Sequence, residues 1–129
     1  MKNYFFLLFF LSSYFGFAQF PTVNDTIYNI VEEMPDFPGG MSAMNSFIAN
    51  NIKLPDSEKL KGVHGYVNVT FVIDENGNVG EVKVAKNTTN SSRAAAEAIR
   101  VVKSMPKWTP GKQGGKFVKV SYYLPVKFT

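Results

Sequence analysis

The sequence contains no cysteine. This absence excludes a disulfide scaffold, a thiolate zinc site, a cysteine nucleophile and the lipid-accepting cysteine of a bacterial lipoprotein. The compartment must therefore be inferred from another feature of the chain. A length of 129 residues indicates a single domain, and 45% hydrophobic with 19% charged residues is typical of a globular protein that can bury a modest core.

Histidine is nearly absent as well, because His64 is the only one. It lies in the glycine-flanked turn Lys61–Gly65, where a solvated loop residue is a more common role than a catalytic base. The sequence offers no Ser-His-Asp set, no paired carboxylates and no metal-binding spacing of His, Asp and Glu beside it. We therefore expect no enzymatic activity, no catalytic residues, no cofactor and no metal ion.

The longest apolar run lies at the N-terminus. It follows Lys2, spans 15 residues from Tyr4 to Ala18, and ends on a small residue suited to a signal peptidase. A membrane-spanning helix needs about 20 apolar residues, so we expect residues 1–18 to be a signal peptide cleaved after Ala18. The alternative is an uncleaved inner-membrane anchor. Loss of Lys2 lowers the formal net charge from +4 to +3, which does not indicate nucleic-acid binding.

The segment 19–36 has few periodic apolar residues and contains Pro21 and Pro35. It predicts a flexible N-terminal arm with at most one short ordered piece, near Ile27–Val31. The pattern changes after Gly39-Gly40, since apolar residues then recur at helical spacing up to Ile52. We expect one helix there and a second short helical piece between Pro55 and Gly62.

Residues 65–73 alternate apolar and polar side chains, the pattern of a half-buried strand. The turn Asp74–Asn78 contains Asn-Gly, the strongest short hairpin signal, and a second strand is expected over 79–84. A calcium loop is the alternative function for this turn. Its glycine is one position late and Ala85 stands where glutamate is expected, so the hairpin is favoured.

The last third of the chain predicts another helix and another strand. Ser91 or Ser92 can cap a helix whose apolar stripe runs from Ala95 to Met105, and Pro106 stops it. The glycine-rich loop 107–115 lacks the spacing of a phosphate-binding loop and reads as a turn. Residues 117–128 alternate again. Lys119, Ser121, Tyr123, Pro125 and Lys127 are expected on the side away from the core.

The order of the expected elements, helix, strand, strand, helix and strand, predicts an α+β fold with a three-stranded antiparallel sheet and two helices packed on one face. A right-handed crossover to the last strand gives the strand order 2-1-3, with the first strand in the centre. Pro125 supports an edge position for the last strand, because proline cannot donate a hydrogen bond within a central strand. The domain should extend over residues 37–129.

A set of motifs in fixed order carries a family resemblance. They are Phe37-Pro38-Gly39-Gly40, Leu54-Pro55, Gly65-Tyr66-Val67, Asp74 to Val79, Met105 to Lys112, and Leu124 to Phe128. Together they resemble the C-terminal domain of the TonB energy transducer, in the form common in Bacteroidetes-type bacteria, over about residues 34–129. Leu54 stands where the family usually has tyrosine.

The resemblance implies a periplasmic domain that binds the TonB-box segments of outer-membrane TonB-dependent transporters by strand addition. An edge strand presents free backbone groups, which agrees with that mechanism. The expected peptide-binding residues are Phe117, Lys119, Ser121, Tyr123 and Trp108. Packing in the core is an equal alternative for Trp108.

A self-associating module, in which the same edge forms a homodimer, or an adaptor of another envelope complex is the alternative function. The 18 residues between Ala18 and Phe37 reach about 60 Å at roughly 3.4 Å per residue. That reach is less than is needed to bridge the two membranes, so we do not expect energy transduction.

Overall fold

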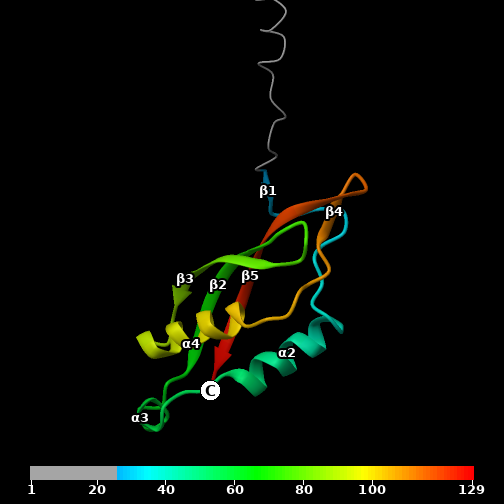
Figure 1. Ribbon diagram of the computed structural model, residues 1–129. Coiled ribbons are helices and arrows are strands. Elements are labelled where there is room, and N and C mark those ends of the chain that lie inside the picture. Colours follow the sequence, from blue (N-terminus) through cyan, green and yellow to red (C-terminus); the bar gives the residue numbers. More distant parts are fainter. Residues whose placement is uncertain (1–25) are drawn as a thin grey trace, which may run out of the picture.

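The computed structural model describes residues 26–129 and arranges them as a sheet with helices on one face (Figure 1). The predicted signal peptide, its cleavage after Ala18 and the first part of the arm lie outside the described residues. Within residues 26–129, no helix is both long and apolar enough to cross a membrane.

Strand β2 (Gly65–Ile73) forms the centre of the sheet. It pairs antiparallel with β3 (Val79–Asn87) on one side and with β5 (Lys116–Phe128) on the other. Its core-facing side chains are almost fully buried; they are Val67, Val69, Phe71 and Ile73. The predicted hairpin and the predicted burial of this face are both confirmed.

The sheet is larger than the three antiparallel strands expected from the sequence. It has five strands in the order β1-β5-β2-β3, with β4 also paired to β5. The three expected strands keep their predicted relative order. Strand β1 (Ile27–Tyr28) is parallel to β5, which makes the sheet mixed, and β4 (Gly111–Gln113) forms from the loop expected to be only a turn. Such short strands depend on distant partners and leave no periodic pattern.

The N-terminal arm pairs with β4 and with the residues just before it. Glu33 exchanges two backbone hydrogen bonds with Lys112, at 3.1 and 2.8 Å, and Asp36 exchanges two with Thr109, at 3.0 and 2.8 Å. Val31 is buried in a small cluster with Val118 and Val120 of β5. The arm, expected to be flexible, is thus paired at four positions, Ile27, Tyr28, Glu33 and Asp36.

The part of the chain that the structure describes contains three helices: the two that were expected to pack on the sheet and the short helical piece expected between Pro55 and Gly62. Helix α2 (Gly40–Asn51) and α4 (Ser92–Lys103) are the predicted long helices, and the short α3 (Asp56–Leu60) lies between them in sequence. The side chain of Ser91 accepts a hydrogen bond from the Ala94 amide at 3.1 Å, which confirms the predicted cap.

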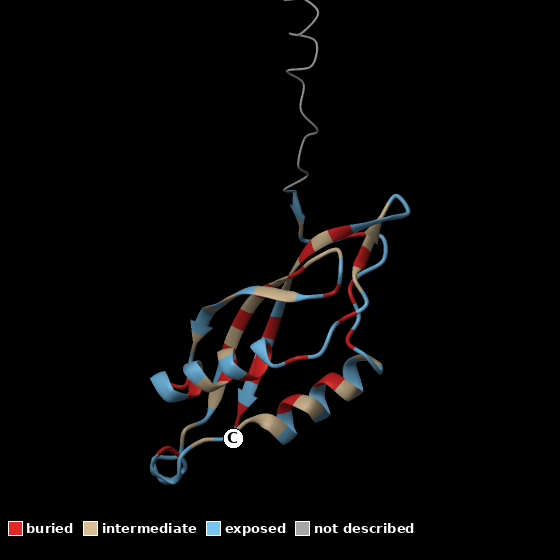
Figure 2. Cartoon of the chain, in the orientation of Figure 1, coloured by how far each residue is buried: buried red, intermediate tan, exposed pale blue. Residues whose placement is uncertain are grey.

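The core lies between these helices and one face of the sheet (Figure 2). Helix α2 contributes Met44 and Ile48, and α4 contributes a stripe of alanine and valine side chains. The outer residues of β2 and β5 remain accessible on the opposite face, where Tyr66 and Tyr123 are exposed. Alternation along the strands therefore separates a covered face from an open one.

The turn of the hairpin contacts the chain after α4. The Trp108 amide donates to the Gly77 carbonyl at 2.9 Å, and Gly77 has a positive φ of 86°. A Cβ at residue 77 would lie 2.0 Å from the Trp108 carbonyl oxygen. Glycine is therefore required here both by the turn and by the close approach.

Candidate functional site

The direction of the backbone groups in the sheet follows from one hydrogen bond beside β3. The Thr88 amide donates to the Tyr66 carbonyl at 2.9 Å, so the backbone groups of Tyr66 point toward β3. These groups alternate in direction along an antiparallel strand, so the odd-numbered residues of β2 point toward β5. Their partners are the even-numbered residues from Val120 to Phe128. The odd-numbered residues of β5 therefore direct their amides and carbonyls away from β2.

This outer side of β5 is open along its C-terminal part. Among residues 26–129, no strand pairs with it beyond Val120. Tyr123 and Lys127 each offer an amide and a carbonyl there, and Pro125 offers only a carbonyl. A proline is tolerated at this position because its missing N–H would have faced outward. We call the stretch Ser121–Phe128 the free edge.

Two of the predicted site residues lie outside the free edge. Phe117 is paired with Lys112 of β4, and Lys119 is paired with Ile27 of β1. The Lys112 ammonium also lies 4.8 Å from the centre of the Phe117 ring, a cation–π distance. The edge that the sequence suggested as open from Phe117 to Lys127 is thus occupied at Lys119, where β1 pairs with it, and Phe117 lies beyond that contact, opposite β4.

Ser121 and Tyr123 do lie on the free edge. Their side chains point to the open face of the sheet, where their cross-strand partners are Val72 and Thr70. Ser121 is half-buried, and Tyr123 is 56% exposed. Of the five predicted residues, the structure brings these two together beside unpaired backbone.

Trp108 lies in the core, which is the packing alternative weighed for it. It is 3% exposed, and its ring centre lies 5.0 Å from that of Tyr122, 5.6 Å from Phe37 and 5.7 Å from Phe71. Its Nε1 is buried without a hydrogen-bond partner. Burial in this aromatic cluster, and secondarily the charge of Asp36, raises the pKa of the Tyr122 hydroxyl.

The opposite edge of the sheet, β3, is irregular. Its pairing with β2 shifts register twice, between Asn68 and Val69 and between Thr70 and Val72. Glu81 has a positive φ of 48° within this irregular part. The pairing of β5 with β2 runs from Val120 to Phe128 without any shift.

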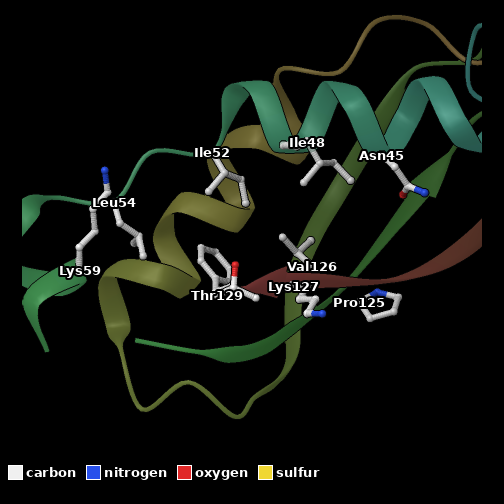
Figure 3. A pocket seen from close by; sticks show the side chains of 11 residues that line it. Asn45, Ile48, Ile52, Leu54, Lys59, Pro125, Val126, Lys127 and Thr129 are labelled. Atoms are coloured by element: carbon white, nitrogen blue, oxygen red, sulfur yellow. The ribbon is translucent and has the colours of Figure 1, made fainter. Parts of the chain in front are cut away.

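A groove lies beside the free edge, between α2 and the end of β5 (Figure 3). Its volume is about 540 Å³. Ile48 and Ile52 point into it from α2 and its C-terminal end, and Val126 lies opposite them. The other lining residues are Asn45, Ala49, Leu54, Lys59, Pro125, Lys127, Phe128 and Thr129. The sequence showed these apolar residues only as core candidates, because no periodic pattern reveals a space between two elements.

The segment that forms one wall of the groove is held by α4. Arg100 Nη2 donates to the Asn51 carbonyl at 2.6 Å, and the Lys53 amide donates to Glu97 Oε2 at 3.2 Å. Glu97 and Arg100 are themselves ion-paired. These contacts join the end of α2 and the residues after it to α4.

A second anchor joins α3 to the start of α4. Glu58 is 6% exposed, and its Oε1 accepts a hydrogen bond from the Ser91 hydroxyl at 2.6 Å. The Lys61 ammonium lies 3.1 Å from Glu58 Oε2. The Ser91 hydrogen bond, followed by that from Lys61, lowers the pKa of the Glu58 carboxyl below its usual value.

The groups considered for catalysis or metal binding have other surroundings. His64 is exposed, and its Nδ1 lies 2.8 Å from the Gly62 carbonyl oxygen. Asp74 Oδ1 accepts hydrogen bonds from the amides of Asn76 and Asn78, both at 2.9 Å, so the carboxylate closes its own turn. Within residues 26–129, no cluster of three or more His, Cys, Asp or Glu residues could hold a metal ion.

Two solved structures share this fold. The TonB C-terminal domain of Helicobacter pylori, residues 194–285, is 23% identical, with a TM-score of 0.55, over 68% of this chain and 90% of that one. A longer form of that domain, residues 179–285, is 22% identical, with a TM-score of 0.52, over 67% of this chain and 76% of that one. At this identity the likeness concerns the fold alone. No curated protein matches the sequence.

The family was identified from the sequence itself. Residues 50–129 match the family model described as the C-terminal part of the Gram-negative bacterial TonB protein. The match begins within α2 and includes the groove residues from Ile52 onward, the hairpin, α4 and the whole of β5. Because it covers more than half of the chain, the chain belongs to the TonB C-terminal domain family.

Proposed function

We propose that this protein is a periplasmic peptide-binding module in TonB-dependent transport. It recognises extended, TonB-box-like segments of outer-membrane transporters by strand addition at the free edge. The observation that carries the proposal is the unpaired and regular edge of β5 beyond Val120. Membership of the TonB C-terminal family supplies the class of partner.

The geometry of the free edge suits an incoming strand. The outward groups of Tyr123, Pro125 and Lys127 lie two residues apart, the spacing at which an added strand meets a sheet. β1 already pairs with this side of β5 at Lys119 and Val120. An added peptide would continue the line of β1.

The interaction should be weak. Each ladder hydrogen bond contributes only about 0.5–1.5 kcal/mol net, and the few available bonds must offset the ordering of a flexible peptide. We therefore expect a dissociation constant roughly between micromolar and millimolar. Weak binding suits a contact that must form and break repeatedly.

Chemical-shift mapping tests the proposal directly. Peptides from the N-terminal segments of outer-membrane transporters are titrated into the labelled domain. We expect the largest shifts at the amides of Tyr123 and Lys127. Shifts centred on the Asn76-Gly77 turn, with β5 unchanged, would refute strand addition and favour an adaptor role. Shifts that depend on protein concentration alone would favour a homodimer.

Export is part of the proposal and has its own test. The apolar run that ends at Ala18 is shorter than a membrane span, so we expect the mature protein to begin at Gln19. Intact-mass measurement on protein from the cell envelope checks this. A mass that retains residues 1–18, together with recovery in the membrane fraction, would instead support the inner-membrane anchor.

A further inference from the structure

The open face of the sheet carries charge of one sign beside exposed aromatic rings. Strands β2, β3 and β5 contain five lysines and a single acidic residue, Glu81. We propose that this face docks on the surface of an anionic phospholipid membrane. Docking is a property separate from peptide binding, because it uses the face of the sheet whereas the peptide uses its edge.

The register of the sheet places lysines and tyrosines together on this face. Residues paired across neighbouring strands point to the same face of a sheet. Thr70 of β2 pairs with Lys83 of β3 on one side and with Tyr123 of β5 on the other. Two more rows follow along the sheet, one of Lys86, Asn68 and Pro125 and one of Tyr66 and Lys127. Lysines therefore flank the two tyrosines across three strands, a width of about 10 Å at roughly 4.8 Å between strands.

The burial of neighbouring residues agrees with this direction of the side chains. Val82 and Val84 pack against the core on the covered face, so Lys83 between them points to the open face. The exposed fractions of Tyr66 and Tyr123 are 44% and 56%. The helices lie against the other face of the sheet (Figure 2), so these groups are accessible to a flat partner.

Acidic residues balance the lysines only at the hairpin end of the face. Asp74 and Glu81 lie around a small hollow there, together with Lys119. That end is therefore close to neutral. The three rows that hold the two tyrosines contain no acidic residue, so the positive charge of the face is concentrated around the rings.

Tyrosines flanked by lysines suit a lipid surface. The amphipathic ring of tyrosine lies at the level of the headgroups, and the long stem of lysine lets its ammonium group reach the phosphates. Each lysine near the surface adds to the attraction of an anionic leaflet. The groups are spread over three strands rather than gathered in a groove, so they match an array of many phosphates better than a single acidic peptide.

Docking of this face leaves the free edge available. Tyr123 belongs to both surfaces, but its ring stands away from the sheet while its amide and carbonyl lie in the plane of the sheet. The free edge would therefore point along the membrane. Confinement to the membrane raises the effective concentration of a partner embedded there, which helps a weak peptide contact to form.

Co-sedimentation of the mature protein with vesicles tests the proposal. Vesicles of phosphatidylglycerol and phosphatidylethanolamine are compared with vesicles of phosphatidylcholine, and no transporter peptide is present. We expect at least about tenfold tighter binding to the anionic vesicles. The difference should disappear between about 0.1 M and about 1 M salt, as the screening length falls from about 10 Å to about 3 Å. Equal binding to both vesicles, or binding to neither, would overturn docking and leave strand addition standing.

A matched pair of double variants locates the contact. Lys83→Gln with Lys86→Gln removes two charges from the open face, and Lys103→Gln with Lys107→Gln removes two exposed charges at the end of α4. We expect the first pair to weaken binding to anionic vesicles at least about tenfold and the second pair less than about twofold. Equal losses would show that net charge alone attracts the protein, which would contradict docking by this face.

Tyr66→Thr tests the aromatic part and keeps a residue suited to a strand. We expect binding to anionic vesicles to weaken severalfold, with the salt dependence retained. The control is Leu60→Ser, which removes an 88% exposed apolar side chain from α3 and should change nothing. Unchanged binding of the tyrosine variant, or an equal loss in both, would refute docking by this face. This test stands even where loss of the two β3 lysines leads to self-association of the protein.

Discussion

The two long edges of the sheet differ in regularity. β3 shifts register twice against β2 and carries Lys83 and Lys86 on its accessible residues. β5 pairs with β2 without a shift from Val120 to Phe128. Bulges and lysines are the usual means by which an edge strand is protected from further pairing.

The difference supports the proposal that a partner strand pairs with β5 rather than with β3. A regular edge keeps its amides and carbonyls in line for an incoming strand, whereas each bulge displaces that line. On the free edge only Pro125 interrupts the row of donors, and it leaves the row of acceptors intact. The same sheet therefore has one irregular edge and one regular edge, and the following changes test whether the regular edge accepts a strand as proposed.

The largest effect should come from β2, the strand that pairs with both β3 and β5. Phe71 of β2 is 1% exposed and packs on Trp108 and Tyr122. We expect Phe71→Ala to lower the free energy of unfolding by about 3–5 kcal/mol, as for other buried aromatic truncations. Denaturant unfolding measures it. Loss of less than about 1 kcal/mol would mean that the covered face is assigned incorrectly.

The second change removes a backbone donor from the free edge, which is the regular edge of this comparison. Tyr123→Pro removes the one outward amide at the middle of the free edge while leaving the bonds to β2 in place. We expect peptide binding to fall at least about tenfold, and the circular dichroism spectrum to stay unchanged. Titration by NMR measures the affinity.

Tyr123→Ala is the matched control. It removes the same exposed side chain and retains the amide, so we expect little change in stability. Its affinity should lie much nearer to that of the original protein than to that of the proline variant. Equal losses in the two variants would show that the side chain, rather than the backbone, binds the peptide.

A smaller effect concerns the link between α3 and the start of α4. Glu58 in α3 holds Ser91, the cap of α4. Because the fold lowers the Glu58 pKa, its stabilisation is complete above the unfolded-state pKa, near 4.5, and is lost as the pH falls through the lowered value. Glu58→Gln should therefore be less stable at pH 7 and should approach the original protein in acid. A difference independent of pH in urea unfolding would exclude this role.

The smallest effect is expected at Ser121. This residue borders β1, and its short side chain faces the open side of the sheet. Recognition through backbone atoms predicts that Ser121→Ala changes peptide affinity by less than about twofold. A larger loss in the same titration would reveal a hydroxyl contact and sharpen the description of the free edge.

Local patterns in the sequence predicted most of the fold. Alternation identified β2, β3 and β5, and Ser91 marked the start of α4. The short ordered piece expected near Ile27–Val31 contains β1, but the sequence did not reveal its pairing with β5 or the strand β4, since each depends on a distant partner, such as Ile27 with Lys119. The bulges of β3 were also missed, because an extra residue in a strand changes the pairing without a distinct composition.

The candidate site was predicted less completely than the fold. Ser121 and Tyr123 lie on the free edge, but Lys119 pairs with β1, and Phe117 lies opposite β4 beyond that contact. Trp108 could not be placed from the sequence, because its cluster joins four segments that are distant along the chain. The groove likewise depends on how far α2 lies from β5, which neither element encodes alone.

The contact between Gly77 and the Trp108 backbone has a practical consequence for labelling this protein. The hairpin turn looks like a convenient place for a tag, yet its glycine leaves no space for a side chain against the Trp108 carbonyl. An insertion there would displace the chain segment that carries the aromatic cluster. The turn at Gly114 and Gly115 is exposed, and a side chain at either residue would meet no atom within 4 Å. Both glycines have a positive φ, 60° and 76°, so a tag is best inserted at that second turn with the two glycines retained, away from both the free edge and the groove.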